Sequence, residues 1–255
     1  MDFDDAYANA AYIPGGDTYP DKWARLAGAF RAQALCELDL PYGESARQRF
    51  DLFHPRRLAR GVVIFVHGGY WLRFDKSFWS HLAAGPLAHG WAVAMPSYDL
   101  CHDVRIAQIG DQITDAIATI AARVPGPIRL AGHSAGGHLV ARVAARPAPW
   151  LDRVAAVVPI SPVADLAPLM HTSMNADLHI DAAEAAAESP VHLPAPPVPV
   201  TVWVGGAERP AFLEQAGLLS EVWHCPLVTA PELHHFNVIE DLADPESALT
   251  RAVLA

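Results

Sequence analysis

The segment "LAGHSAGGHL" at residues 130–139 contains a serine whose surroundings suit a nucleophile. Gly132, Ser134 and Gly136 form the pattern G-x-S-x-G, which follows an apolar run and precedes a helical pattern. Strand, tight turn and helix in this order are typical of a nucleophile elbow, where a strained backbone exposes the hydroxyl and glycines leave room for the crossing chain. The pattern by itself is a weak signal, because small residues are common where a strand meets a helix. Acyl transfer needs further groups, which must come from elsewhere in the chain.

A serine hydroxyl becomes nucleophilic when a base removes its proton and a third group orients that base. After a nucleophile elbow, the acid and then the histidine follow in the chain. Glu208 lies just past an apolar run in "VWVGGAERPAF", and His235 lies in "PELHHFNVIEDL", directly before Phe236, which can anchor the loop. Asp165 in "SPVADL" is the competing acid and His234 the alternative base, so both choices stay open at this point.

Hydrogen-bond donors are also needed where negative charge develops on the substrate oxygen. The backbone N–H of Ala135, directly after the serine, is one expected donor. The segment "FVHGGYW" at residues 65–71 ends an apolar run with two glycines, which allow the N–H groups of Gly69 and Tyr70 to face the site. The sequence therefore predicts an oxyanion hole built from two separate turns.

Short apolar runs alternate with helical patterns along the chain, which predicts crossover units and a mostly parallel sheet. One helix is expected over about residues 103–124, where five isoleucines recur at steps of three and four and so share a face. The runs expected as strands are "GVVIFVHGG" (61–69), "WAVAMPSYD" (91–99), "IRLAGHS" (128–134), "VAAVVPISP" (154–162) and "VPVTVWVGG" (198–206).

We expect residues 1–255 to form a single domain, because no internal repeat or convincing linker interrupts the pattern. Residues 165 to about 192 break the alternation and predict a small, partly helical lid-like insertion, placed after a strand where ligands bind in such sheets. "RQRFDLF" at residues 47–53 is expected to be an antiparallel edge strand.

Composition excludes several classes of function. The chain has 255 residues, 52% of them hydrophobic and 18% charged, which indicates a large buried core. A formal net charge of −10 argues against a nucleic-acid partner or a polybasic membrane contact. No apolar run approaches the roughly 18 residues of a spanning helix, and the acidic amino terminus shows no secretory signal.

Three widely spaced cysteines, Cys36, Cys101 and Cys225, form no C-x-x-C pair, and the thirteen histidines include no H-E-x-x-H pattern. We therefore expect free thiols, a cytoplasmic location, and no metal or other cofactor. A homodimer is compatible with the sequence.

At "HGGYW" and "GHSAGGHL" the chain resembles the kynurenine formamidase (arylformamidase) branch of the α/β-hydrolases, and the similarity extends over most of the sequence. The resemblance implies an α/β-hydrolase fold with helices on both faces of the sheet. It also implies that Ser134 is the nucleophile, His235 the base, and Gly68 to Tyr70 with Ala135 the oxyanion region. The acid falls on Glu208, where the animal enzymes carry aspartate.

The reaction implied is hydrolysis of a small acyl compound, an aryl formamide such as N-formylkynurenine or a carboxylic ester, through an acyl-enzyme. A short-chain carboxylesterase or thioesterase is the alternative, followed by a catalytically silent binding protein. Trp71 and His133 are candidates for the substrate pocket. Arg73 and Arg209 are candidates for holding a substrate carboxylate, although solvated surface positions suit both.

Overall fold

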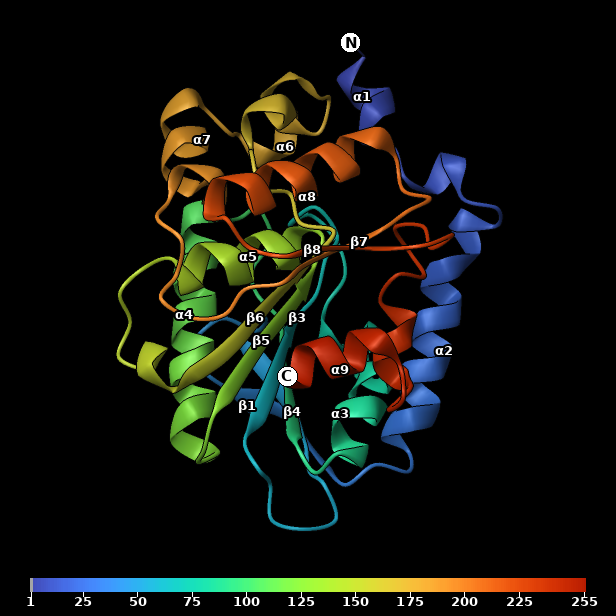
Figure 1. The fold of residues 1–255 in the computed structure, drawn as a ribbon, viewed down its shortest axis with the longest axis vertical. Helices are drawn as coiled ribbons and strands as arrows, with labels where there is room; N and C mark the ends of the chain where they lie inside the picture. Colours follow the sequence, from blue (N-terminus) through green and yellow to red (C-terminus); the bar gives the residue numbers. More distant parts are fainter. Residues whose placement is uncertain (1) are drawn as a thin grey trace.

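An eight-stranded sheet runs through the centre of the protein in the computed structural model, which describes residues 2–255 (Figure 1). The strand order is β1-β2-β4-β3-β5-β6-β7-β8. β2 is antiparallel to both β1 and β4, and every other neighbouring pair is parallel. This mostly parallel sheet confirms the predicted α/β class. The strands span Cys36–Pro41 (β1), Arg49–Phe53 (β2), Val62–Val66 (β3), Ala92–Pro96 (β4), Ile128–His133 (β5), Val154–Ile160 (β6), Val202–Gly205 (β7) and Leu227–Ala230 (β8).

Helices cover both faces of the sheet (Figure 1). The buried cluster on one face includes residues of α4, α5 and α8, and the cluster on the other face includes residues of α2 and α9. No helix within residues 2–255 has the length and apolar character needed to span a bilayer. The α-helices are Phe3–Ala6 (α1), Tyr19–Arg31 (α2), Ala84–Ala88 (α3), Ile106–Arg123 (α4), Ala135–Ala144 (α5), Asn175–Leu178 (α6), Ala182–Glu188 (α7), Pro210–Trp223 (α8) and Ala248–Leu254 (α9).

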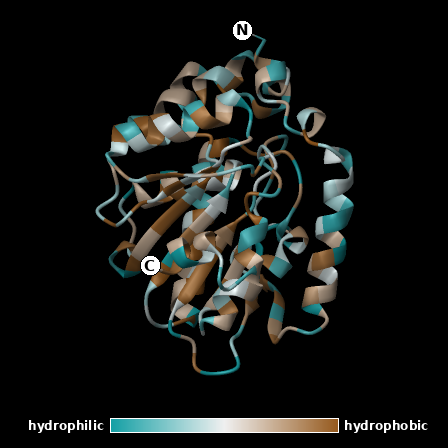
Figure 2. Cartoon of the chain, turned by 45° about the vertical axis from the view of Figure 1, so that its right-hand side comes forward, coloured by the Kyte–Doolittle hydropathy of each residue, from teal (hydrophilic) through white to brown (hydrophobic). Residues whose placement is uncertain are grey.

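The continuous apolar sequence of β3 follows from burial on both faces. Val62, Ile64 and Val66 belong to the cluster beneath α4 and α5, and the intervening Val63 and Phe65 belong to the cluster on the other face. Successive side chains of a strand point to opposite faces, so a strand covered on both sides must be apolar throughout. Figure 2 shows the resulting concentration of hydrophobic residues along the central strands.

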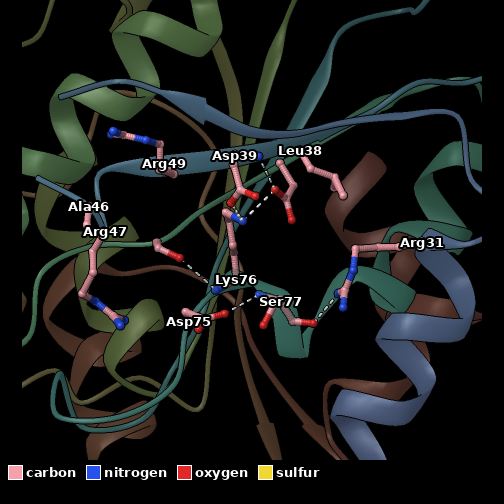
Figure 3. A pocket seen from close by; sticks show the side chains of 11 residues that line it. Arg31, Leu38, Asp39, Ala46, Arg47, Arg49, Asp75, Lys76 and Ser77 are labelled. Carbon is pink, nitrogen blue, oxygen red and sulfur yellow. Dashed lines mark hydrogen bonds and ion pairs between the residues drawn. The ribbon is translucent and has the colours of Figure 1, made fainter. Parts of the chain in front are cut away.

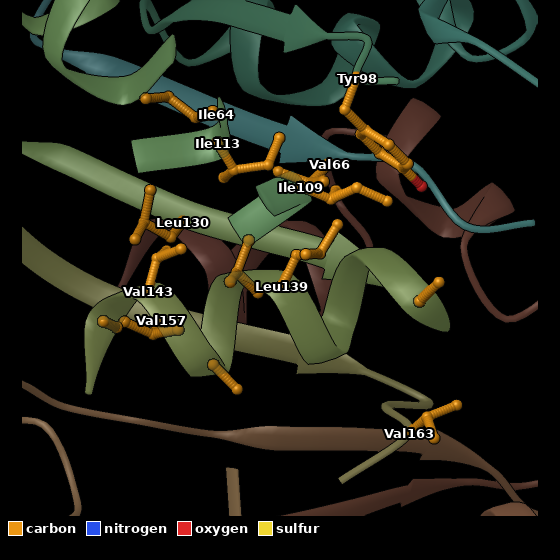
Figure 4. Close-up of a cluster of buried hydrophobic side chains, with 14 of the residues drawn as sticks. Ile64, Val66, Tyr98, Ile109, Ile113, Leu130, Leu139, Val143, Val157 and Val163 are labelled. Carbon is orange, nitrogen blue, oxygen red and sulfur yellow. The ribbon is translucent and has the colours of Figure 1, made fainter. Parts of the chain in front are cut away.

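Helix α4 buries the five isoleucines that predicted it. Ile109 and Ile113 lie close to Ile64 and Val66 of β3 in the core cluster of Figure 4. Burying one such side chain contributes roughly 1.5–3 kcal/mol, so this stripe holds the helix firmly on the sheet. All five are fully buried: Ile106, Ile109, Ile113, Ile117 and Ile120.

The two outer strands of the sheet differ from the expectation. The strand predicted at residues 47–53, β2, is antiparallel to its neighbours as expected. It is not the edge strand, because β1 pairs with it on the side away from β4. Most β1 side chains are exposed, and two of the four β8 side chains at the opposite edge are exposed too. An edge strand with little buried surface lacks the apolar pattern by which strands are recognised, so neither β1 nor β8 was predicted.

The segment at residues 165–192, the proposed insertion, is partly helical. It contains two short α-helices, α6 and α7, and 3₁₀ turns at Ala167–His171 and Pro190–His192. Arg105, at the start of α4, donates to Glu184 of α7 at 2.6 and 2.8 Å, which ties the insertion to the body of the protein.

Two fully buried histidines predict a loss of stability in acid. Burial lowers the pKa of His67 to about 4 and that of His138 to about 3. In the unfolded chain a histidine titrates near ~6.5, so below that pH the unfolded state binds more protons than the folded state. The free energy of unfolding should therefore fall as the pH drops from about 6.5 to about 4, by on the order of 3 kcal/mol for each histidine.

Thermal unfolding between pH 7 and pH 4 measures this effect. The matched variant is His138→Gln, because an amide can replace the donor that His138 Nε2 directs to the Glu188 carbonyl at 2.9 Å. Its Tm should fall less steeply with pH than that of the wild type. Equal slopes of Tm against pH for the two proteins would contradict a contribution of His138 to the loss of stability in acid.

Candidate active site

Ser134 occupies the sharp turn between β5 and α5. Its backbone has φ +55° and ψ −117°, a conformation that residues other than glycine rarely adopt. The flanking glycines have no room for a side chain: a Cβ on Gly136 would lie 2.0 Å from the Val66 carbonyl oxygen, and one on Gly132 would lie 2.2 Å from the Gly136 carbonyl oxygen. The strained, crowded turn predicted from G-x-S-x-G is therefore present.

Glu208 and His235 form a buried pair. Glu208 follows β7, His235 follows β8, and the His235 Nδ1 to Glu208 Oε2 distance is 2.6 Å. Because Nδ1 carries the hydrogen donated to the carboxylate, the opposite ring nitrogen, Nε2, is free to accept a proton. The ring is held between Phe212 and His133, at centroid distances of 4.1 and 4.6 Å.

The alternative acid and base have other contacts. The carboxylate of Asp165 accepts a hydrogen bond from the Ala167 N–H at 2.9 Å, two residues further along the chain. His234 Nδ1 lies 3.2 and 3.3 Å from the backbone N–H groups of Phe236 and Asn237, and Nε2 lies 3.2 Å from the Tyr19 hydroxyl. His234 thus stabilises the loop that carries its neighbour.

The turn after β3 lies directly against the nucleophile turn. A Cβ on Gly68 would be 3.0 Å from the Ser134 Cβ. Gly69, Tyr70 and Trp71 have φ values of +115°, +54° and +58°, so three successive residues adopt the left-handed region. Within residues 2–255, the backbone N–H groups of Gly69, Tyr70 and Ala135 have no protein acceptor.

The elbow serine, the imidazole of His235 and the turn after β3 line one cavity of about 650 Å³. Ser134, His235 and His133 line it, together with Gly68, Gly69 and Tyr70. In the part of the chain that the structure describes, the Ser134 hydroxyl makes no hydrogen bond to an imidazole. Catalytic hydrogen bonds are often long before substrate binds and shorten in the complex, so this geometry is compatible with proton transfer. Aromatic side chains form part of the wall: Trp23, Phe74, Trp79 and Phe236.

His133 lies beside the base without competing for its proton. Burial, and then repulsion from a charged His235, lower the pKa of His133 well below its ordinary value. It therefore stays neutral over the pH range in which a histidine base works.

The amino-terminal segment supplies a wall of the cavity that sequence reasoning missed. Asp4, Tyr7 and Asn9 line it, whereas the insertion at 165–192 contributes Ser173 and Met174. No local pattern marks these residues, because they reach the site only through tertiary contacts.

Arg209 and Tyr70 hold that segment in place. Arg209 donates to the Asp5 carboxylate at 2.7 Å, and its guanidinium lies 3.6 Å from the centre of the Tyr12 ring. The Tyr70 hydroxyl donates to the Tyr7 carbonyl oxygen at 2.6 Å. Arg209 is thus occupied by the protein itself.

The prediction of Trp71 as a pocket residue is wrong. Its side chain is fully buried and meets the His138 ring edge to face at 5.0 Å. The left-handed backbone at this position turns the indole into the core rather than toward the cavity. Arg73, two residues later, does line the cavity.

A second cavity, of about 340 Å³, lies beside β1 and β2 away from these groups (Figure 3). The buried Lys76 ammonium lies 2.7 Å from carboxylate oxygens of both Asp39 and Asp51. Its charge is therefore paired within the protein. Across residues 2–255 there is also no cluster of three side chains suited to holding a metal ion.

A mostly parallel sheet carrying an elbow serine, with a carboxylate-paired imidazole lining the same cavity, defines an enzyme of the hydrolase class. The family model for the alpha/beta hydrolase fold matches residues 63–191. The chain belongs to this α/β-hydrolase family, as the resemblance implied.

Relatives and a solved structure agree with this assignment. The chain is 29% identical to kynurenine formamidase of Salmo salar, with 89% of this chain and 84% of the relative covered. It is 31% identical to kynurenine formamidase of Drosophila melanogaster, with 83% and 78% covered. The crystal structure of a candidate thioesterase from Silicibacter sp. tm1040 matches over the whole of both chains, with 56% identity and a TM-score of 0.97.

Proposed function

We propose that the protein hydrolyses small acyl compounds, with Ser134 as nucleophile, His235 as general base and Glu208 as the group that orients the base. The observation that carries the proposal is the buried His235–Glu208 pair, joined at 2.6 Å, whose imidazole lines the same cavity as Ser134. A carboxylate at Nδ1 fixes the tautomer in which Nε2 accepts the serine proton.

In the proposed reaction, the Ser134 oxygen attacks the substrate carbonyl carbon and His235 takes the hydroxyl proton. The resulting oxyanion accepts hydrogen bonds from the N–H groups of Gly69, Tyr70 and Ala135. The bond to the leaving amine, alcohol or thiol breaks, and His235 returns the proton to the leaving atom. Water then attacks the acyl-enzyme by the same route, releases the acid and restores the serine. Protein groups supply each step, so the proposal needs no cofactor or metal.

An aryl formamide such as N-formylkynurenine is the substrate class we favour. The aromatic side chains of the cavity offer stacking surfaces for an aryl ring. Two relatives with kynurenine formamidase names extend over most of the chain. A thioester or ester is the second candidate, because the structure with 56% identity is described as a candidate thioesterase.

Comparing kcat/KM on N-formylkynurenine, phenyl acetate and S-phenyl thioacetate tests the proposal. We expect the formamide to have the highest value although it is the least reactive of the three in water. Turnover of the thioester without turnover of the formamide would instead favour the second candidate. Failure to hydrolyse any of them would favour a silent binding protein.

We further propose a cytoplasmic location. Cys36, Cys101 and Cys225 are all free thiols, the form that a reducing compartment maintains.

A further inference from the structure

Ser161 lies at the end of β6, the strand next to β7 in the sheet. Its side chain is fully buried, and its backbone has φ +47°, in the left-handed region. The Ser161 N–H donates to the Trp203 carbonyl oxygen of β7 at 2.6 Å. A left-handed conformation at a residue other than glycine costs on the order of 1–3 kcal/mol and persists where its surroundings impose it.

The hydroxyl of Ser161 donates to the Oε1 atom of Glu208. The Gly205 N–H donates to the same oxygen at 2.8 Å. The other oxygen, Oε2, receives the hydrogen bond of His235 Nδ1. The two oxygens of this buried carboxylate therefore have separate partners, and the donors on Oε1 fix which oxygen faces the imidazole.

We propose that Ser161 is a positioning residue, which fixes the Glu208 carboxylate so that Glu208 in turn orients His235; the proposal rests on the proposed roles of these two residues. A glutamate side chain has several rotatable bonds, so a single backbone donor leaves its carboxylate free to turn. A second, charge-assisted hydrogen bond from a rigid strand end removes that freedom.

The same hydroxyl should affect the pH dependence of the reaction. It holds the negative charge of Glu208 beside the imidazole, and a carboxylate at this position favours the protonated ring. The other ionisable groups facing the pair are His133 from β5, Tyr70 from the turn after β3, and the adjacent His234. Burial favours the uncharged form of all three, and the nearby Arg209 is paired with Asp5, so Glu208 is the dominant charge beside the base.

Ser161→Gly and Ser161→Ala, assayed on whichever acyl substrate the wild type turns over, test the proposal. Both remove the hydroxyl, but glycine adopts a positive φ without strain and so also keeps the backbone. We expect kcat to fall about ten- to a hundredfold in both variants, with KM changed less than about twofold. The acidic half-maximum of the pH–kcat profile should move to lower pH, because a carboxylate that turns away no longer stabilises the protonated imidazole. The matched control is Ser189→Ala, because Ser189 is equally buried but its hydroxyl bonds to the Ala185 carbonyl, away from Glu208.

Wild-type kcat and pH profile in Ser161→Gly would overturn the positioning role while leaving the proposed function intact. A fall in kcat without a shift of the profile, matched by a fall in Tm, would also overturn it, because that pattern indicates a purely structural serine. Failure of the proposed function is seen separately, as full activity in Ser134→Ala.

Discussion

Replacing Ser134 with alanine is expected to reduce kcat for acyl hydrolysis by about 10⁴- to 10⁶-fold, to the residual rate that binding and the oxyanion donors alone provide. The change deletes one buried oxygen and keeps the side-chain volume nearly constant. No protein hydrogen bond of the Ser134 hydroxyl is lost within residues 2–255, so the fold should persist.

Activity and thermal unfolding, measured on the same preparation, separate loss of chemistry from loss of structure. The Tm of Ser134→Ala should stay close to that of the wild type, and Ser189→Ala should remain active. If Ser134→Ala retained substantial turnover, the nucleophile would have to be another group, and the proposed mechanism would be wrong.

The second large effect is expected at His235. His235→Gln should lower kcat by about 10⁴-fold or more, because an amide cannot take the serine proton during attack or return it to the leaving atom. Glutamine keeps a polar side chain of similar size beside Phe212, so packing is largely preserved.

His234→Gln is the matched control. His235→Gln removes the proposed base. His234→Gln instead removes a side chain that contacts backbone N–H groups of its own loop. We expect His234→Gln to keep kcat within about tenfold of the wild type, a limit that allows for some loosening of the loop. The reverse ranking of the two variants would transfer the role of base to His234.

The sequence by itself determined the features that depend on neighbouring residues. The turn at Gly132, Ser134 and Gly136 is recognisable because neither glycine has room for a Cβ. The obstacle at Gly132 is the Gly136 carbonyl of the same turn, and the obstacle at Gly136 is the Val66 carbonyl of β3. The five central strands were recognisable because burial on both faces demands continuous apolar runs. The isoleucine stripe of α4 was recognisable because one helix face is buried. β1 and β8 bury too little surface to leave such a pattern.

Only the tertiary structure decided which distant groups meet. Spacing along the chain could not choose between Glu208 and Asp165, because the choice depends on which carboxylate the fold directs toward His235. Ser161 shows no local pattern, since its contact with Glu208 joins residues 47 positions apart. The same reason applies to the amino-terminal wall of the cavity and to the buried position of Trp71. Contacts between segments far apart in the sequence determine both features, so the local sequence does not predict them.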